Sequence, residues 1–226
     1  MAREDEKEPR GKQMPDQPEK SGKQSLATGV KGTLVGTAAA YLLLRAGSGY
    51  GWLLRPPGAG NEADFLKKCL RCGRCAHACP YDAVQMAKLT EGIAIGTPVI
   101  VARDNPCRLC PDLPCVKACP SGALDPELKD AAKTRMGTAV IVEREECLSL
   151  KGLRCEVCYR ACPLIDKAIT IENYLNVRTG RHAIFEPVVH KQHCTGCGIC
   201  EQACVLERPA IVVGPLQPPS ESWYEG

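Results

Sequence analysis

Hydrophobic and polar positions divide the 226-residue chain into regions of different character. A polar, Lys- and Gln-rich start is typical of a disordered tail. It is followed by an apolar run that only Arg45 interrupts and that no A-x-A cleavage pattern follows. The missing cleavage pattern favours an uncleaved anchor over a removed leader. An ordinary soluble helix would need a solvated face, which no polar residues of this run provide. The pattern predicts a disordered charged tail (1–31), a hydrophobic anchor or uncleaved signal-like segment (32–54), a main domain (55–213) and a C-terminal arm (214–226).

Short elements are expected within the main domain. The run Asn61-Glu62-Ala63-Asp64 is typical of a helix start, so EADFLKK predicts a short helix at 62–68. Further helices are expected at 79–88 and near 126–134. Alternating or β-branched runs predict strands at 97–103, 137–143, 168–173, 182–189 and 210–213.

The cysteine pattern changes this picture. All sixteen cysteines lie between positions 69 and 204, in four groups of four. The first group is spaced C-x2-C-x2-C-x3-C-P; in the second, one gap is x4, and in the third the first gap is x7. The fourth group keeps the first spacing but ends in Val205 instead of proline. The groups are Cys69, Cys72, Cys75 and Cys79; Cys107, Cys110, Cys115 and Cys119; Cys147, Cys155, Cys158 and Cys162; and Cys194, Cys197, Cys200 and Cys204.

This spacing is typical of [4Fe–4S] clusters. Three closely spaced cysteines wrap one face of a cubic cluster, and the fourth ligates the partner cluster of a two-cluster module. The proline that follows fits a first helical turn. Structural zinc prefers two C-x2-C pairs separated by a dozen or more residues, and a disulfide framework suits a small secreted domain. The sequence therefore predicts four [4Fe–4S] clusters with all sixteen cysteines as ligands.

Composition and charge narrow the possible functions. With two Phe, two Trp and six Tyr, the aromatic core is thin, so the clusters must serve as core. Lys and Arg exceed Asp and Glu by nine to six in residues 1–60, and the counts are equal, 20 and 20, in 61–226. Each oxidised cluster with its thiolates adds roughly −2. The loaded domain is thus anionic, which argues against nucleic-acid binding. No nucleotide loop, flavin fingerprint or nucleophile elbow is present, which predicts an electron carrier, not an enzyme.

Sequence adjacency suggests how the motifs pair. The second loop, a helix, a strand and the third loop follow one another and would form an inner two-cluster unit, flanked by an outer unit of the first and fourth motifs. Sequential pairing is the alternative. The fold class expected is α+β, with two ferredoxin-like two-cluster units in one domain of loops, short strands and helices. In crossed ligation, each cluster takes three cysteines from one motif and the fourth cysteine of the paired motif. The four ligand sets expected are Cys69, Cys72, Cys75 with Cys204; Cys194, Cys197, Cys200 with Cys79; Cys107, Cys110, Cys115 with Cys162; and Cys147, Cys155, Cys158 with Cys119.

The motifs also resemble a known family. RPPGA, CGRCAHACPYDAV, ARDNPC, DLPCVKACPSGAL, LKGLRCEVCYRACPLIDKAIT and HCTGCGICEQACVLERPAI are similar to the NapG/MauM ferredoxin-type proteins, from about residue 53 to 213. The resemblance implies a membrane-associated or periplasmic repeat ferredoxin. It would pass electrons from a membrane quinol dehydrogenase (NapH-like) to a downstream redox protein such as periplasmic nitrate reductase, or serve methylamine dehydrogenase formation. Pairing of outer and inner motifs also resembles the iron–sulfur subunits of molybdopterin oxidoreductases.

The N-terminus departs from the family pattern. Such proteins usually carry a twin-arginine signal, whereas the nearest counterpart here is SGKQSL at 21–26, without an Arg pair. Lys20, Lys23 and Lys31 precede the apolar segment and favour an N-terminus inside and clusters outside. We expect an inner-membrane association through 32–54 and a periplasmic cluster domain, with the cytoplasmic face as the alternative.

A few side chains beside the ligand loops could tune the clusters. His77 and His193 could donate hydrogen bonds to a cluster, although a solvated role is more usual for such a histidine. Arg71, Arg74 and Lys117 lie between ligands and could raise local potentials, or be exposed loop cations.

Overall fold

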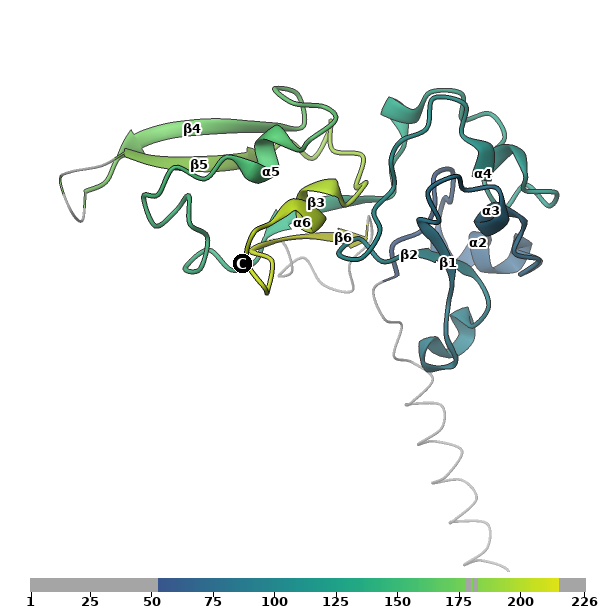
Figure 1. Cartoon of the computed structure of the whole chain (residues 1–226). Helices are drawn as coiled ribbons and strands as arrows, with labels where there is room; N and C mark the ends of the chain where they lie inside the picture. Colours follow the sequence, from purple (N-terminus) through teal and green to yellow (C-terminus); the bar gives the residue numbers. More distant parts are fainter. Residues whose placement is uncertain (1–52, 178–179, 181–182, 216–226) are drawn as a thin grey trace, which may run out of the picture. The chain divides into compact units, whose positions relative to one another are not determined.

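The computed structural model describes residues 53–215 apart from 178–179 and 181–182, all within one compact unit, Arg45–Gly226. Short helices, short strands and long loops make up this part of the chain (Figure 1). The expected α+β class is confirmed. Its helices are α2 (Glu62–Lys68), α3 (Arg74–His77), α4 (Pro114–Lys117), α5 (Val157–Arg160) and α6 (Ile199–Ala203), with 3-10 turns η1 (Leu89–Ala94) and η2 (Ala131–Lys133). Its strands are β1 (Val84–Met86), β2 (Pro98–Ile100), β3 (Gly137–Ile141), β4 (Ile169–Leu175), β5 (Ala183–Val189) and β6 (Ile211–Pro215).

Three expected regions fall largely outside these residues. The tail at 1–31 is not described, nor is the apolar segment except for its last two residues, nor the arm from 216 onward. Within the described ranges, no helix is long and apolar enough to span a bilayer.

The first two cysteine motifs fold together. A bridge joins Ala59, before the first motif, to Leu124, after the second. Strands β1 and β2 form an antiparallel pair in which Val84 faces Ile100. Phe65 of α2 is 2% exposed and packs with the buried side chains of both motifs. Residues 53–134 therefore form an N-terminal half with its own core.

The last two motifs repeat this plan. Strand β3 precedes the third motif and pairs antiparallel with β6, which follows the fourth, from Gly137–Pro215 to Ile141–Ile211. Strands β4 and β5 form a longer antiparallel hairpin between the two motifs. Ile141, Ile169 and Ile211 are the largest members of the core beneath them. Residues 135–215 form the C-terminal half.

A third core joins the halves. It combines Leu54, Ile100 and Ala102 with Met136 and Cys197. Gly198, with φ of +88°, lies so close to Ala102 that a β-carbon at this position would come within 2.5 Å of the Ala102 side chain. Only glycine allows both this conformation and this approach.

Two helix expectations were wrong. Residues 79–88 form a turn and strand β1, because Asp82 takes a left-handed φ of +51° and the following residues pair with β2. Residues 126–134 contain only the turn η2, where the Asp130 side chain accepts a hydrogen bond from the Ala132 amide at 2.9 Å. The helix at 62–68 is confirmed, with Asn61 accepting a hydrogen bond from the Ala63 amide.

Candidate metal centres

The sixteen cysteines are all free thiols, which argues against a disulfide framework. In the part of the chain that the structure describes, no three His, Cys, Asp or Glu side chains converge closely enough to hold one metal ion. The thiols instead gather in four sets. We call these centre I (Cys69, Cys72, Cys75, Cys119), centre II (Cys79, Cys107, Cys110, Cys115), centre III (Cys162, Cys194, Cys197, Cys200) and centre IV (Cys147, Cys155, Cys158, Cys204).

Centre I surrounds a hollow at the end of α2. Three of its thiols come from the first loop and line this hollow together with Cys119 and Phe65. The Leu124 amide lies 3.5 Å from the Cys119 sulfur, and the Ser121 hydroxyl 3.7 Å from it. Burial alone would raise the pKa of Cys119, but these hydrogen bonds outweigh burial and lower it. Cys119 is therefore prepared to act as a thiolate ligand.

Centre II is deeper. Burial raises the pKa of Cys107 to about 12, opposed by a hydrogen bond from the Leu109 backbone. Burial likewise raises the pKa of Cys115 to about 11, with a further increase from the neighbouring thiol of Cys79. Cys79 also interacts with Cys110. The fourth cysteine of the first motif thus lies with the three leading cysteines of the second.

Centre III has the most buried loop. Cys194, Cys197 and Cys200 are each at most 8% exposed, and they line a hollow together with Cys162. The Ala139 amide of β3 lies 3.4 Å from the Cys194 sulfur. Burial raises the pKa of Cys200 well above its usual value.

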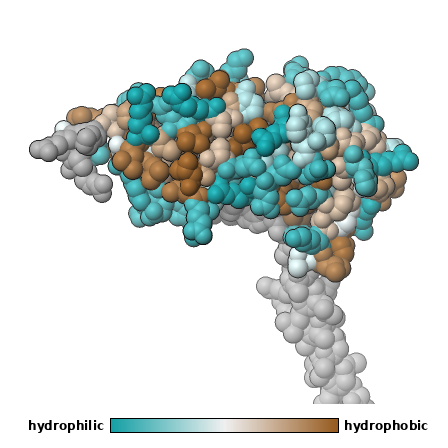
Figure 2. Space-filling view, in the orientation of Figure 1, coloured by the Kyte–Doolittle hydropathy of each residue, from teal (hydrophilic) through white to brown (hydrophobic). Residues whose placement is uncertain are grey.

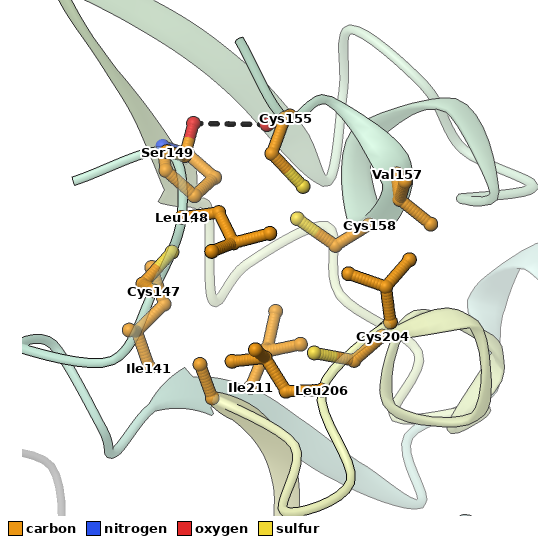
Figure 3. A pocket seen from close by; sticks show the side chains of 13 residues that line it. Ile141, Cys147, Leu148, Ser149, Cys155, Val157, Cys158, Cys204, Leu206 and Ile211 are labelled. Atoms are coloured by element: carbon orange, nitrogen blue, oxygen red, sulfur yellow. Dashed lines mark hydrogen bonds between the residues drawn. The ribbon is translucent and has the colours of Figure 1, made fainter. Parts of the chain in front are cut away.

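Centre IV lies across the β3–β6 pair. Figure 3 shows Cys147, Cys155, Cys158 and Cys204 around one hollow, with Leu148, Leu206, Ile141 and Ile211 among its apolar lining. The Ser149 hydroxyl donates to the Cys155 carbonyl at 2.9 Å and holds the loop of the widened x7 gap. Burial raises the pKa of Cys158 to about 12, and Cys147 adds to the effect. Without metal the Cys158 thiol would stay protonated at neutral pH, so metal binding must displace its proton.

These sets fit cubic iron–sulfur clusters. Each set provides four thiols, which in centres I, III and IV surround a hollow, and backbone amides donate to the sulfurs of Cys119 and Cys194, as cluster thiolates require. A cluster bound there would supply one-electron chemistry. The chain's own contribution is to bury the thiols, orient the loops and donate hydrogen bonds to sulfur.

The pairing of motifs differs from the expected outer and inner units. Cys204 lies with the third motif, not the first, and Cys119 lies with the first motif, not the third. Cys79 lies with the second motif and Cys162 with the fourth. The physical reason is that β3 does not tie the second loop to the third. It pairs with β6 beyond the fourth motif, just as residue 59 pairs beyond the second.

The four centres form a continuous series. The thiols of Cys75 and Cys115 are near enough for their charges to interact, which places centres I and II side by side. The Cys107 amide donates to the Cys197 carbonyl at 2.9 Å, which joins centre II to centre III. Cys158 interacts with Cys200, which joins centre III to centre IV. The order is I, II, III, IV, with the third motif at the far end.

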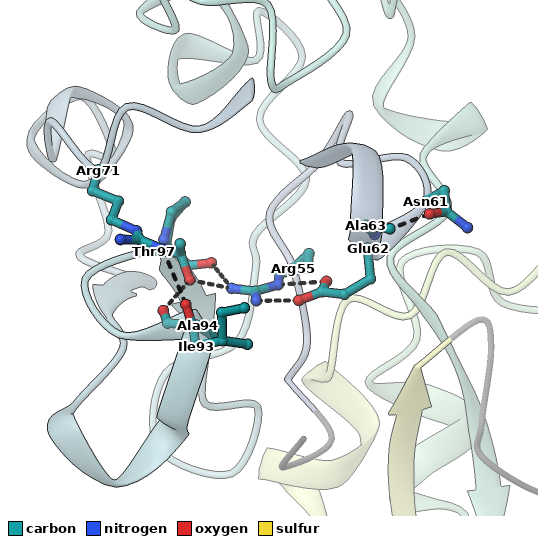
Figure 4. A network of polar contacts seen from close by, with 9 residues as sticks. Arg55, Asn61, Glu62, Ala63, Arg71, Ile93, Ala94 and Thr97 are labelled. Atoms are coloured by element: carbon teal, nitrogen blue, oxygen red, sulfur yellow. Dashed lines mark hydrogen bonds and ion pairs between the residues drawn. The ribbon is translucent and has the colours of Figure 1, made fainter. Parts of the chain in front are cut away.

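A buried arginine supports the loop before centre I. Arg55 is 5% exposed; it donates to Thr97 at 2.8 Å and to the Pro98 carbonyl at 2.9 Å, and it pairs with Glu62 (Figure 4). Its guanidinium lies 4.9 Å from the centroid of the Phe65 ring, and this ring lines the hollow of centre I. No pattern in the sequence indicated this role, because the single arginine in RPPGA has no periodic pattern around it.

A second arginine that the sequence analysis missed holds the two halves together. Arg103 donates to the carbonyls of Glu201, Cys204 and Leu206 at 2.8, 2.9 and 2.8 Å. The side chains singled out beside the loops are less engaged: His77, His193, Arg71, Arg74 and Lys117 are all exposed. Their tuning roles stay predictions.

Comparison with known proteins supports this grouping of motifs. A model of the 4Fe-4S dicluster domain matches residues 68–123, which hold the first two motifs, and again residues 151–207, which hold the last two motifs apart from Cys147. The ferredoxin-type protein NapG of Escherichia coli (strain K12) is 59% identical over 163 residues, which is 72% of this chain and 71% of that protein. The methylamine utilization ferredoxin-type protein MauM of Methylorubrum extorquens is 45% identical over 201 residues, 87% of this chain and 90% of that protein. The chain belongs to the NapG/MauM family of ferredoxin-type proteins.

Membership of this family settles the general class. The chain is a ferredoxin-type electron carrier, not an enzyme, with two dicluster domains and four [4Fe–4S] clusters. The ferredoxin-type protein NapF of Escherichia coli (strain K12) is more distant, 29% identical over 151 residues, 67% of this chain and 79% of that protein. No solved structure matches the chain.

Proposed function

We propose that the chain is a linear four-cluster relay in which each centre holds one [4Fe–4S] cluster. The observation that carries the proposal is the series of neighbouring thiols from centre I to centre IV, in which the hydrogen bond from the Cys107 amide to the Cys197 carbonyl joins the two middle centres. The ligand sets are the four defined above. Within each half, the fourth cysteine of one motif serves the cluster of the other motif.

The partners of the relay follow from the family. The similarity to NapG implies the context of a Nap system. In this proposal a NapH-like membrane quinol dehydrogenase supplies the electrons, and a downstream redox protein such as periplasmic nitrate reductase receives them. The cluster domain lies on the periplasmic side and associates with the membrane through residues 32–54.

A complementation assay tests the relay. A strain that expresses a Nap system without its own NapG-type protein receives either this chain or its Cys197→Ser variant, which removes a ligand of centre III. We expect quinol-driven nitrate reduction with the unmodified chain and its loss with Cys197→Ser. Nitrate reduction driven by reduced viologen, which bypasses the relay, should be equal in both strains. Equal quinol-driven rates with and without Cys197 would contradict the relay.

The second candidate function is an accessory role in maturing a partner dehydrogenase. It is favoured by MauM of Methylorubrum extorquens, which matches 87% of this chain where NapG of Escherichia coli matches 72%, although at lower identity. The same assay separates the two functions. An accessory protein would leave the partner inactive even with viologen whenever the chain is absent, whereas loss of a relay leaves viologen-driven activity intact.

Protease treatment tests the side of the membrane. In intact spheroplasts, an external protease should cut the cluster domain, detected with an antibody against residues 61–226. Cutting only after lysis would place the domain in the cytoplasm and would remove a periplasmic acceptor from the proposal.

A further inference from the structure

Cys72 differs from the other fifteen cysteines in its contact with solvent. It is exposed, whereas every other cysteine is buried or half-buried. Since Cys72 belongs to centre I, one end of the series of centres opens directly to solvent. An electron can enter or leave the relay there without crossing a layer of protein.

The surface around Cys72 has an apolar centre and a cationic rim. Leu70 is 67% exposed and Ile93 is 55% exposed. Arg71 connects their loops, because its guanidinium donates to the Ile93 carbonyl at 3.0 Å. Lys68 and Arg74 are exposed on either side of the ligand Cys72 in the sequence. Figure 2 shows hydrophobic residues over the η1 turn, with hydrophilic residues around them. We call Lys68, Leu70, Arg71, Arg74 and Ile93 the centre I face.

The cations of the centre I face lack carboxylate partners. Among the described residues, none of Lys68, Arg71 and Arg74 makes an ion pair. The other end of the relay is different. Near centre IV, Lys151 pairs with Glu146 at 2.8 Å, and Arg154 pairs with Glu156 at 3.1 Å.

We propose that the centre I face is the docking site of an acidic redox protein, whose carboxylates surround its own cofactor. This inference rests on the proposed relay function and names the kind of partner at one end. An apolar centre with a charged rim is the usual anatomy of a protein–protein interface, and the rim charges set the association rate. Docking brings the partner's cofactor to Cys72, and a single electron then passes between the two cofactors without atom transfer.

A redox protein fits this face better than an anionic membrane surface. Even with Leu89 of the η1 turn, which is 84% exposed, the exposed apolar side chains Leu70 and Ile93 give little area for insertion into lipid. A lipid layer would also cover the one exposed cysteine ligand. The two occupants also predict different behaviour in kinetic experiments.

Ionic strength gives a test with a defined sign. Lys and Arg balance Asp and Glu at 20 each in residues 61–226, so clusters of roughly −2 each make the loaded domain anionic overall. An acidic partner is therefore repelled by the whole molecule, and added salt should then speed its reaction. Docking on the centre I face predicts the opposite, because the local cations attract the partner and salt screens them.

The experiment uses the holoprotein and a plant-type [2Fe–2S] ferredoxin as an acidic probe. Reduced probe donates one electron to this chain in a stopped-flow instrument over a range of salt. The variant is Lys68→Glu with Arg74→Glu, two side chains without hydrogen bonds among those described. The matched control is Lys133→Glu with Lys167→Glu, which makes the same charge change at exposed positions elsewhere. Arg71→Lys keeps the charge and should keep the salt dependence. Reduced methyl viologen serves as a small cationic donor.

The expected result is a rate that falls with salt in the unmodified chain. It should drop at least about tenfold at low salt in the Lys68/Arg74 variant and change little in the control. A rate that rises with salt, or equal losses in variant and control, would overturn the inference. Loss of binding to anionic lipid vesicles in the Lys68/Arg74 variant, with an unchanged rate from the probe, would assign the face to a membrane instead and also overturn it. If viologen reduces the chain but the Lys68/Arg74 variant accepts electrons from the probe at the unmodified rate, only the docking proposal is refuted. A chain that no donor reduces refutes the relay function too.

Discussion

Arg103 offers a direct test of how the two halves are held together. Its guanidinium reaches the carbonyls of Glu201, Cys204 and Leu206 at 2.8, 2.9 and 2.8 Å. These three residues lie about a hundred positions further along the chain, and Cys204 is a proposed ligand of centre IV. One side chain of the N-terminal half thus fixes a ligand loop of the C-terminal half.

The magnitude follows from these hydrogen bonds. Replacing Arg103 with methionine keeps much of the stem and removes every donor. A hydrogen bond from a charged group contributes about 1.5–3 kcal/mol, but Arg103 is half-buried and water can replace part of the set. We therefore expect a total loss of about 2–3 kcal/mol. If the bonds are broken before the clusters leave, this loss speeds cluster release roughly 30- to 150-fold, at about 1.4 kcal/mol per factor of ten.

The assay follows bleaching of the cluster absorbance in guanidinium chloride. Cluster release is irreversible, so its rate is the proper measure of stability. The control is Arg108→Met, since Arg108 makes one exposed hydrogen bond to the Gln202 side chain at 3.2 Å and should change the rate little. Release at the unmodified rate in Arg103→Met, or equal effects in both variants, would refute the interpretation of Arg103 as a clamp between the halves.

Three further changes have expected outcomes. Gly198→Ala should sharply lower the yield of cluster-loaded protein, because the added methyl would lie 2.5 Å from a neighbouring side chain at a φ of +88°; iron content per chain measures this. Ser121→Ala should lower the reduction potential of centre I in a redox titration followed by electron paramagnetic resonance, because the Cys119 thiolate loses a hydrogen bond; an unchanged potential would remove Ser121 from its role. The pKa of Glu186 is lowered because hydrogen bonds, first among them that from Arg144 at 2.6 Å, outweigh its burial. The contribution of ionised Glu186 to the stability of the fold is then fully present above the usual pKa of a carboxyl group, and it is lost as the pH falls through the lowered pKa. Arg144→Gln should therefore speed cluster release at neutral pH and have little effect in strong acid, whereas an effect of the same size at both pH values would contradict this.

The sequence predicted which cysteines are ligands better than it predicted which motifs share a cluster. The spacing within each motif is local, so the loops around the centres follow directly from it. Which motifs combine depends on strand pairing between residues far apart, such as Ile141 with Ile211. Nothing in the alternation of residues 137–143 indicated whether their partner lay before or after the fourth motif. The expected inner and outer units failed for this reason.

The local elements show the same division. Asn61 and the charges of 62–68 define a helix without outside help, and that helix is present. Residues 84–86 were expected in a helix, but they form a strand because they pair with residues 98–100. A prediction from neighbouring residues alone cannot identify that partner strand. The role of Arg103 could not be predicted, because its acceptors are backbone carbonyls in another motif. Every residue has a backbone carbonyl, so no residue type in the sequence indicates such an acceptor.

The central claim is that consecutive motifs share clusters, and Cys204 tests it most directly. In the Cys204→Ser holoprotein, brief treatment with an alkylating reagent followed by peptide mass spectrometry shows which thiols have lost cluster protection. The structure predicts new labelling of the centre IV cysteines, Cys147, Cys155 and Cys158, while the centre I cysteines Cys69 and Cys75 stay as protected as in the unmodified chain. New labelling of Cys69 and Cys75, with Cys147, Cys155 and Cys158 still protected, would show that the first and fourth motifs share a cluster and would contradict the account.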